Sequence, residues 1–141
     1  MSGVAGRREL VIRARQVMQA RLSERDLKLT CVSGELFVSS RQLQRAFFEA
    51  GSEGFRRELS KMRVTRAVQL FYNQPQLSVA QVAASVGYSH APFFARTFRS
   101  QMGCAPGEWH RRCLRRKRKE NQGDQVSVGG ISSLDDARRG L

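Results

Sequence analysis

The sequence contains few of the residues that build metal sites and disulfides. Its 141 residues include two histidines and three cysteines. Cys31, Cys104 and Cys113 are odd in number and lack the spacing of a metal site or a disulfide framework. We therefore expect no metal ion, no other cofactor and a reduced setting such as the cytoplasm.

Long apolar segments are also missing. No run of 18 apolar residues exists, so no segment is expected to span a membrane. Arg7 and Arg8 are not followed by an apolar stretch, which argues against a general or twin-arginine secretion signal. The pattern favours a protein without a membrane partner.

Acidic residues are scarce, at 12 against 25 lysines and arginines, and the formal net charge is +13. Residues 120–141 hold four acidic residues and two arginines, a net charge of −2, so residues 1–119 carry +15. A domain this basic points to a polyanionic partner, because each cation placed against a phosphate releases condensed counterions. Nucleic acid fits this description, and an anionic membrane surface is the alternative that charge alone leaves open.

The apolar pattern predicts an all-α protein. No segment alternates apolar and polar residues as a half-buried strand does. Seven helices are expected, at about residues 9–22, 29–36, 40–49 and 55–71, then from residue 78, through residues 93–98 and from residue 106. Two of their boundaries carry specific signals: Ser78 with Gln81 is a capping-box pair, and Gly103 suits a helix C-terminus.

The expected helix at 55–71 differs from the others because its apolar residues fall on more than one side. Such a helix has neighbours on both sides, as a connector between two lobes would have.

The C-terminal part of the chain differs in composition from the rest. Residues 113–119 form a basic extension, and residues 120–141 are polar and rich in Gly and Ser. We expect that last segment to be a disordered tail.

An internal repeat is the strongest signal in the chain. Val32 and Val82 are 50 residues apart and have similar neighbours; Phe47 and Phe98 are 51 apart. In each unit a small residue sits in a first helix, a turn follows, and a serine precedes a second helix that an aromatic residue anchors. Arg45 and Arg96 lie two residues before those anchors and are expected to point outward. This is the helix-turn-helix arrangement, whose second helix enters the DNA major groove.

Two positions of the repeat have distinct expectations. The tight turn suits Gly87 well and the corresponding Phe37 less well. Ser39 and Ser89 follow the turns, where each can cap the second helix or donate to a phosphate.

Three stretches resemble the AraC/XylS family of bacterial transcription regulators. They are VSSRQLQRAFFEAG at 38–51, MRVTRAVQLF at 62–71, and SVAQVAASVGYSHAPFFARTFRSQMGCAPGEWHRR at 78–112. The resemblance implies one DNA-binding domain over residues 8–112. Within it, the first helix-turn-helix occupies about 27–48, the connector helix about 55–71 and the second helix-turn-helix about 78–100.

The same resemblance assigns the DNA-contacting positions. In the first recognition helix they are Ser39, Ser40, Arg41, Gln44 and Arg45. In the second they are His90, Ala91, Pro92, Ala95, Arg96 and Arg99. The chain departs from the family pattern at Lys28, where a capping Thr or Ser is usual, at Phe37, where Gly is usual, and at Glu58, where an aromatic residue is usual.

The function implied is sequence-specific regulation of transcription by binding double-stranded DNA. A monomer would place its two recognition helices in adjacent major grooves of an asymmetric operator, with RNA polymerase as a further partner that this role allows. The chain is either a small stand-alone regulator or a fragment of a larger one. A non-specific nucleic-acid-binding or RNA-binding protein is the alternative. An enzyme, such as a DNA-repair fusion remnant, is not expected, because no cysteine has partners in the sequence.

The basic run at 111–119 has two interpretations. It adds phosphate contacts, or it serves as a solubilising flank.

Overall fold

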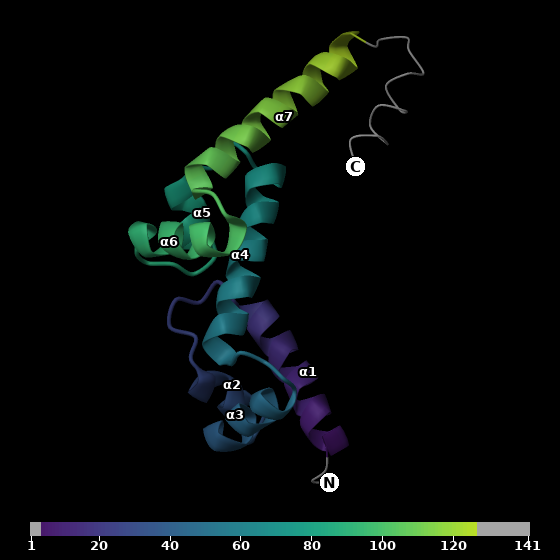
Figure 1. Cartoon of the computed structure of the whole chain (residues 1–141), viewed down its shortest axis with the longest axis vertical. Helices are drawn as coiled ribbons and strands as arrows, with labels where there is room; N and C mark the ends of the chain where they lie inside the picture. The colour runs from purple at the N-terminus through teal and green to yellow at the C-terminus, as the bar shows by residue number, and fades with distance from the viewer. Residues whose placement is uncertain (1–3, 127–141) are drawn as a thin grey trace.

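The computed structural model describes residues 4–126, and in that range the chain is all α-helical, as predicted (Figure 1). Its seven helices are α1 (Val4–Arg21), α2 (Leu29–Glu35), α3 (Ser40–Glu49), α4 (Phe55–Asn73), α5 (Val79–Ser85), α6 (Ala91–Met102) and α7 (Pro106–Val126). None of the described residues forms a strand. Three helices precede α4 and three follow it.

Local sequence signals set several helix ends. At the start of α5 the Ser78 hydroxyl accepts from the Gln81 backbone N–H at 3.1 Å, while the Gln81 side chain accepts from the Ser78 N–H at 2.8 Å. Ser39 and Gln42 form the same capping box at the start of α3. Each such cap stabilises a helix by about 1 kcal/mol. The predicted C-terminal glycine is confirmed, since Gly103 ends α6 in the left-handed conformation at φ 80°.

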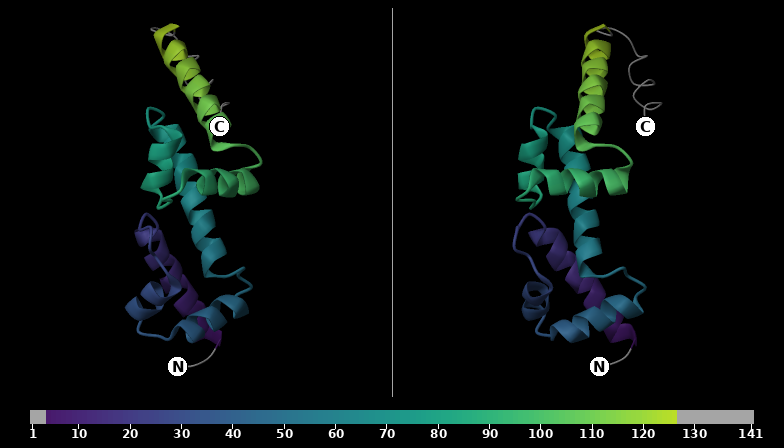
Figure 2. Two further views of the ribbon diagram at one scale, coloured as in Figure 1. Left: turned by 90° about the vertical axis from the view of Figure 1, so that its left-hand side faces the viewer. Right: turned by 60° about the vertical axis from the view of Figure 1, so that its left-hand side comes forward.

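The molecule has two lobes that share α4 (Figure 2). We call α1–α3 the N-terminal lobe and α5–α7 the C-terminal lobe. α4 contacts α1 in the first and α5, α6 and α7 in the second. Its buried residues are Leu59, Val64, Ala67, Leu70 and Phe71. The expectation of a connector with two apolar faces is thus confirmed.

A charged clamp fixes α1 to α4. Arg15 on α1 donates to both carboxylate oxygens of Glu58 on α4, at 2.7 and 2.9 Å. The Ser52 hydroxyl donates to the same carboxylate. The Glu58 side chain is only 15% exposed. A glutamate at this position is therefore explained by its cationic partner on the neighbouring helix, which no local sequence pattern reveals.

This clamp makes stability depend on pH. Hydrogen bonds from Arg15 lower the pKa of the Glu58 carboxyl in the folded state. The stabilisation is fully present above the unfolded-state pKa of about 4.3 and is lost as the pH falls through the lower folded-state value. Glu58→Gln should lower the free energy of unfolding by about 1–3 kcal/mol at pH 7.

Urea unfolding of wild type and the Glu58→Gln variant at pH 7 and pH 3 measures this effect. The difference between them should shrink at pH 3, because the unfolded wild-type chain then binds a proton at Glu58 that Arg15 resists in the folded state. Glu9→Gln, at an exposed position of α1, is the control and should change little at either pH. A Glu58→Gln deficit that is equal at both pH values would contradict the clamp.

Two boundaries differ from the sequence prediction. α1 starts at Val4, not near Glu9. α7 continues to Val126, so residues 120–126, which were expected to belong to a disordered tail, are helical. Residues 127–141 of that expected tail lie outside the described part. Near residue 120 the helix is supported by long-range contacts. The Tyr72 hydroxyl donates to Glu120 at 3.0 Å, and the Lys117 ammonium lies 4.6 Å from the Tyr72 ring centroid.

Candidate nucleic-acid interface

The first helix-turn-helix is α2, the turn at 36–39, and α3. The Val38 N–H donates to the Ser33 carbonyl at 3.0 Å, which closes the turn. Ser33 is buried, and its hydroxyl lies 3.1 Å from that of Ser40. Ser39 caps α3, so both candidate serines already serve the fold, and Ser40 is only partly exposed.

α3 separates a buried face from an exposed one. Leu43, Ala46 and Phe47 are buried. The candidate contact residues Arg41, Gln44 and Arg45 are exposed on the other side. The Arg45 side chain is 76% exposed and lies 3.8 Å from Glu49, so it is held loosely. These three side chains form the face of α3 that is accessible to a binding partner.

The second helix-turn-helix repeats this geometry in α5, the turn at 86–90, and α6. The Tyr88 N–H donates to the Ala83 carbonyl at 2.9 Å, the counterpart of the bond in the first unit. Ser89 does not cap α6, contrary to one option from the sequence. The N-cap is His90, whose side chain makes no capping bond, and Pro92 lies in the first turn, where its fixed φ suits a helix start.

α6 likewise buries one face and exposes the other. Phe94 and Phe98 are buried. The exposed candidate residues are His90, Ala91, Pro92, Arg96 and Arg99, and Ala95 is half-buried. The structure thus gathers the sequence-predicted residues of the second unit on one helix face. α3 and α6 each run across the long axis of the molecule, one in each lobe (Figure 2).

The turn of the first unit contains an unusual residue. Phe37 has φ 59°, the sole positive φ outside glycine among the described residues, and Gly87 at the matching turn has φ 95°. Phe37 is 93% exposed, so no packing compensates for this conformation. The poor fit of Phe37 to the turn, predicted from the sequence, is therefore confirmed: an aromatic residue occupies a left-handed backbone conformation, which lowers the stability of the fold.

Phe37→Gly should raise the free energy of unfolding by about 0.5–1 kcal/mol. A left-handed non-glycine residue costs roughly 1–2 kcal/mol, while glycine loses about 0.5–1 kcal/mol more backbone entropy on folding. Chemical denaturation checks the result. Phe37→Ala keeps the Cβ atom and should stay close to wild type. Equal stability of the Gly and Ala variants would argue against strain at this turn.

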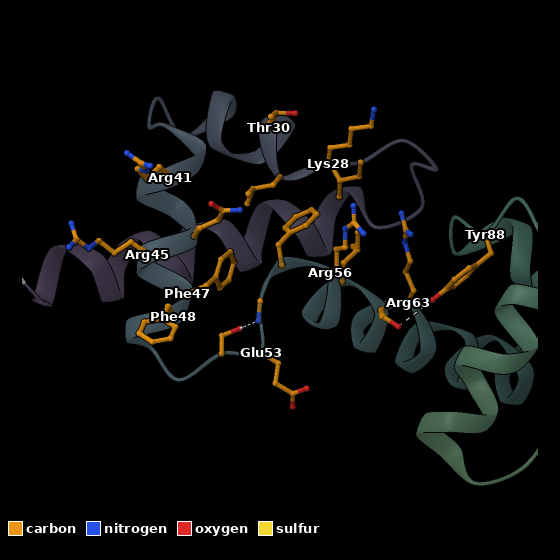
Figure 3. Close-up of a pocket in the computed structure, with 18 of the residues that line it drawn as sticks. Lys28, Thr30, Arg41, Arg45, Phe47, Phe48, Glu53, Arg56, Arg63 and Tyr88 are labelled. Carbon is orange, nitrogen blue, oxygen red and sulfur yellow. Dashed lines mark hydrogen bonds between the residues drawn. The ribbon is translucent and has the colours of Figure 1, made fainter.

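An open groove lies between the two lobes beside α3 (Figure 3). We call it the inter-lobe groove. It is lined by residues of the α1–α2 loop, of α3, of α4 and of the turn before α6. Members of this lining include Lys28, Thr30, Arg41, Gln44, Arg45, Arg56, Arg63, Tyr88 and Phe93. The groove connects the exposed face of α3 to the start of α6.

Arg63 of α4 joins the two lobes at this groove. Its guanidinium donates to the backbone carbonyls of Leu22 at 2.8 Å and Glu24 at 2.7 Å. The same group lies 5.6 Å from the ring centroid of Tyr88 in the C-terminal lobe. Partial burial lowers the pKa of Arg63, but an arginine so bonded remains charged. Arg63 therefore fixes the orientation of one lobe relative to the other.

Three further cations near the groove were not among the predicted contact residues. Lys28 and Arg56 line it, and Arg25 lies in a smaller adjoining hollow with His90 and Arg96. All three lie outside the internal repeat, which begins at Val32 in the first unit and at Val82 in the second. In the sequence, only Lys28 gave a hint of such a role, because it stands where a capping Thr or Ser is usual. In the structure it is the N-cap of α2 and makes no side-chain cap hydrogen bond.

Other chemistry receives no support from the described residues. No group of three or more His, Cys, Asp or Glu side chains among them could hold a metal ion. Cys31, Cys104 and Cys113 are all free thiols. Within residues 4–126, no helix is both long and apolar enough to cross a membrane.

A family model described as a helix-turn-helix domain matches residues 32–112. An uncharacterised HTH-type transcriptional regulator of Mycobacterium tuberculosis is 40% identical over 83 residues, which is 59% of this chain and 24% of that protein. The chain thus spans about a quarter of that relative's length.

Two solved structures share the fold. A transcriptional regulator of Chromobacterium violaceum, described as an AraC-type DNA-binding domain-containing protein, is 28% identical with a TM-score of 0.69. The match covers 77% of this chain and 96% of that one. The DNA-binding domain of AdpA, solved in complex with a target DNA, has the same TM-score and coverages at 20% identity. At that identity the AdpA match shows the fold alone.

Proposed function

The chain belongs to the AraC-type helix-turn-helix family of transcription regulators, and from this premise we propose that it binds double-stranded DNA sequence-specifically. One observation carries the proposal. Two helix-turn-helix units of matching geometry each expose the same kind of helix face, and Arg63 bonds across the lobes that hold them. A rigid pair of recognition helices can enter two successive major grooves.

The exposed side chains suit base recognition. Arg45 and Arg96 can donate two hydrogen bonds to guanine, and Gln44 can pair with adenine. Ala91, Pro92 and Ala95 offer apolar contact to thymine methyl groups instead of hydrogen bonds. Ser39 and Ser40 are better suited to supporting the turn, because their hydroxyls already have partners in the protein.

The two helices differ in sequence, so their sites should differ. We infer that one molecule binds an asymmetric operator of two unlike boxes about one helical turn, or roughly 34 Å, apart. α4 has 19 residues, and at about 1.5 Å per residue it is about 28 Å long. Because each lobe adds width beyond the end of α4, this length is compatible with that spacing.

Selection of bound duplexes from random DNA, followed by titration of variants, tests the proposal. Arg45→Ala and Arg96→Ala should each weaken binding to the selected duplex by about 1–3 kcal/mol and relax base choice at separate positions. Arg96→Ala should have the larger effect, because the second unit follows the family pattern more closely.

Arg13→Ala is the matched control, since Arg13 is exposed, belongs to α1 and lies in neither recognition helix. Wild-type affinity of both recognition-helix variants at fixed salt would place base readout elsewhere. Equal affinity for selected and scrambled duplexes would instead favour the non-specific nucleic-acid-binding alternative. Preference for RNA over duplex DNA would also overturn the proposal.

The proposal describes a binding protein that catalyses no reaction. Because regulation of transcription requires access to the chromosome, we infer that the protein acts in the bacterial cytoplasm, with RNA polymerase as a candidate second partner.

A further inference from the structure

We propose that the inter-lobe groove and the smaller hollow beside it bind the DNA backbone between the two operator boxes, with Lys28 and Arg56 of the groove and Arg25 of the hollow as phosphate contacts. This inference rests on the proposed function and extends it to a part of the duplex that neither recognition helix reaches. It identifies a second binding surface, formed by the α1–α2 loop and by the N-terminal part of α4.

The geometry of duplex DNA gives the first step. Two adjacent major grooves on one face of B-DNA are separated by one minor groove, and that minor groove is bordered by both phosphate backbones. A protein with α3 in one major groove and α6 in the next must present the surface between these helices to that segment. The surface between α3 and α6 is the inter-lobe groove, since residues of α3, Tyr88 and Phe93 all line it.

The charge of this surface gives the second step. Arg25, Lys28 and Arg56 are exposed. None of the three forms an ion pair with another residue in the described part of the chain. Unpaired exposed cations are available for phosphate without the loss of an existing salt bridge. Figure 3 shows the charged ends of Lys28, Arg56 and Arg63 on the same side of α4.

The acidic residue at the groove does not cancel this charge. Glu53 is the sole carboxylate among the residues that line it. Its oxygens lie 3.2 Å from the Lys61 ammonium and 3.4 Å from the Arg57 guanidinium, so it is already paired. In Figure 3 it points away from the side that Lys28 and Arg56 face.

The loop that carries Arg25 is ordered before DNA arrives. Arg63 binds the Glu24 carbonyl, and the Leu27 N–H donates to the same carbonyl at 3.2 Å. Leu22 and Leu27, on either side of Arg25, are buried. Arg25 therefore extends from an anchored backbone, which lowers the entropy lost on binding. Arg63 itself is excluded from the proposed contacts, because its donors already hold the loop.

Salt-dependent titration and hydroxyl-radical footprinting test the inference on the duplex selected by the wild-type protein. The variants are Arg25→Gln, Lys28→Gln, Arg56→Gln and the triple combination, and the control is Arg13→Gln, with circular dichroism to confirm folding. Each lost phosphate contact should reduce the slope of log K against log salt by about 0.9. The triple variant should thus lose about 2–3 from the slope while keeping its base preferences.

The footprint separates the groove from the recognition helices. In wild type, the sugars of the spacer between the two boxes should be protected along with both boxes. In the triple variant the spacer should become accessible while both boxes stay protected. An unchanged slope with an unchanged spacer footprint would overturn the inference and leave the proposed function intact. Equal wild-type affinity for selected and scrambled duplexes would overturn both.

Discussion

Gly87→Ala is expected to lower the free energy of unfolding by about 2–5 kcal/mol, through two separable effects. Gly87 has φ 95°, a conformation that costs a residue with a Cβ atom about 1–2 kcal/mol. An added Cβ would also lie 2.7 Å from the Leu22 carbonyl oxygen and 3.0 Å from Nε and Nη2 of Arg63. Relieving such a clash costs about 1–3 kcal/mol.

The collision occurs where the two lobes meet, so it should also affect DNA binding. The Leu22 carbonyl is one of the two that Arg63 binds, and moving it would alter the orientation of the lobes. We expect the variant to lose affinity for the two-box duplex more than for either box alone. Titration against single-box and two-box duplexes measures that difference.

Gly103→Ala is the matched control for Gly87→Ala. Gly103 also has a positive φ, of 80°, but an added Cβ there would have nothing within 4 Å. The variant should show the conformational cost of about 1–2 kcal/mol and no more. Equal unfolding free energies for the two variants in urea would mean that the contact between the lobes is not tight.

Phe98→Ala should cost about 3–5 kcal/mol, the usual range for removing a buried aromatic side chain. Phe98 is fully buried at the centre of the C-terminal lobe. Its ring centroid lies 5.9 Å from that of Phe71, 5.7 Å from Phe94 and 6.2 Å from Trp109. Because α6 carries Arg96 on its other face, loss of this anchor should weaken DNA binding as well.

Thermal or urea unfolding checks the Phe98 prediction, with Phe93→Ala as the control on the same helix. Phe93 is 52% exposed, so its removal should cost far less. For a domain whose total stability is about 5–15 kcal/mol, the Phe98 variant is expected to lose much of its folded population on warming. Similar unfolding free energies for the two variants would mean that the aromatic cluster does not anchor α6.

Local patterns were enough to predict both recognition helices. The buried and exposed faces of α3 and α6 follow from the 3.6-residue period, so Arg45 and Arg96 could be placed opposite Phe47 and Phe98 from the sequence. The capping boxes involve residues three apart, and the turn geometry involves neighbours. All of these interactions join residues close together in the sequence. Because the pattern occurs in two units of the chain, each unit supports the interpretation of the other.

The remaining features of the interface could not be predicted, because they join residues far apart in the chain. Arg63 is 41 residues from Leu22, and Arg15 is 43 residues from Glu58. Ser40 looked available for DNA, but Ser33 lies beside its hydroxyl once α2 packs on α3. The hydrogen bond that Glu120 of α7 accepts likewise comes from a distant residue, Tyr72, 48 positions earlier.

The sequence by itself therefore determined the helices, the two helix-turn-helix units and the residues that face outward from each. Only the tertiary structure decided how the lobes are oriented and which cations line the inter-lobe groove. The physical reason is that helix periodicity and capping depend on residues within one or two turns. The position of Arg25 beside the start of α6, by contrast, depends on the packing of both lobes against α4.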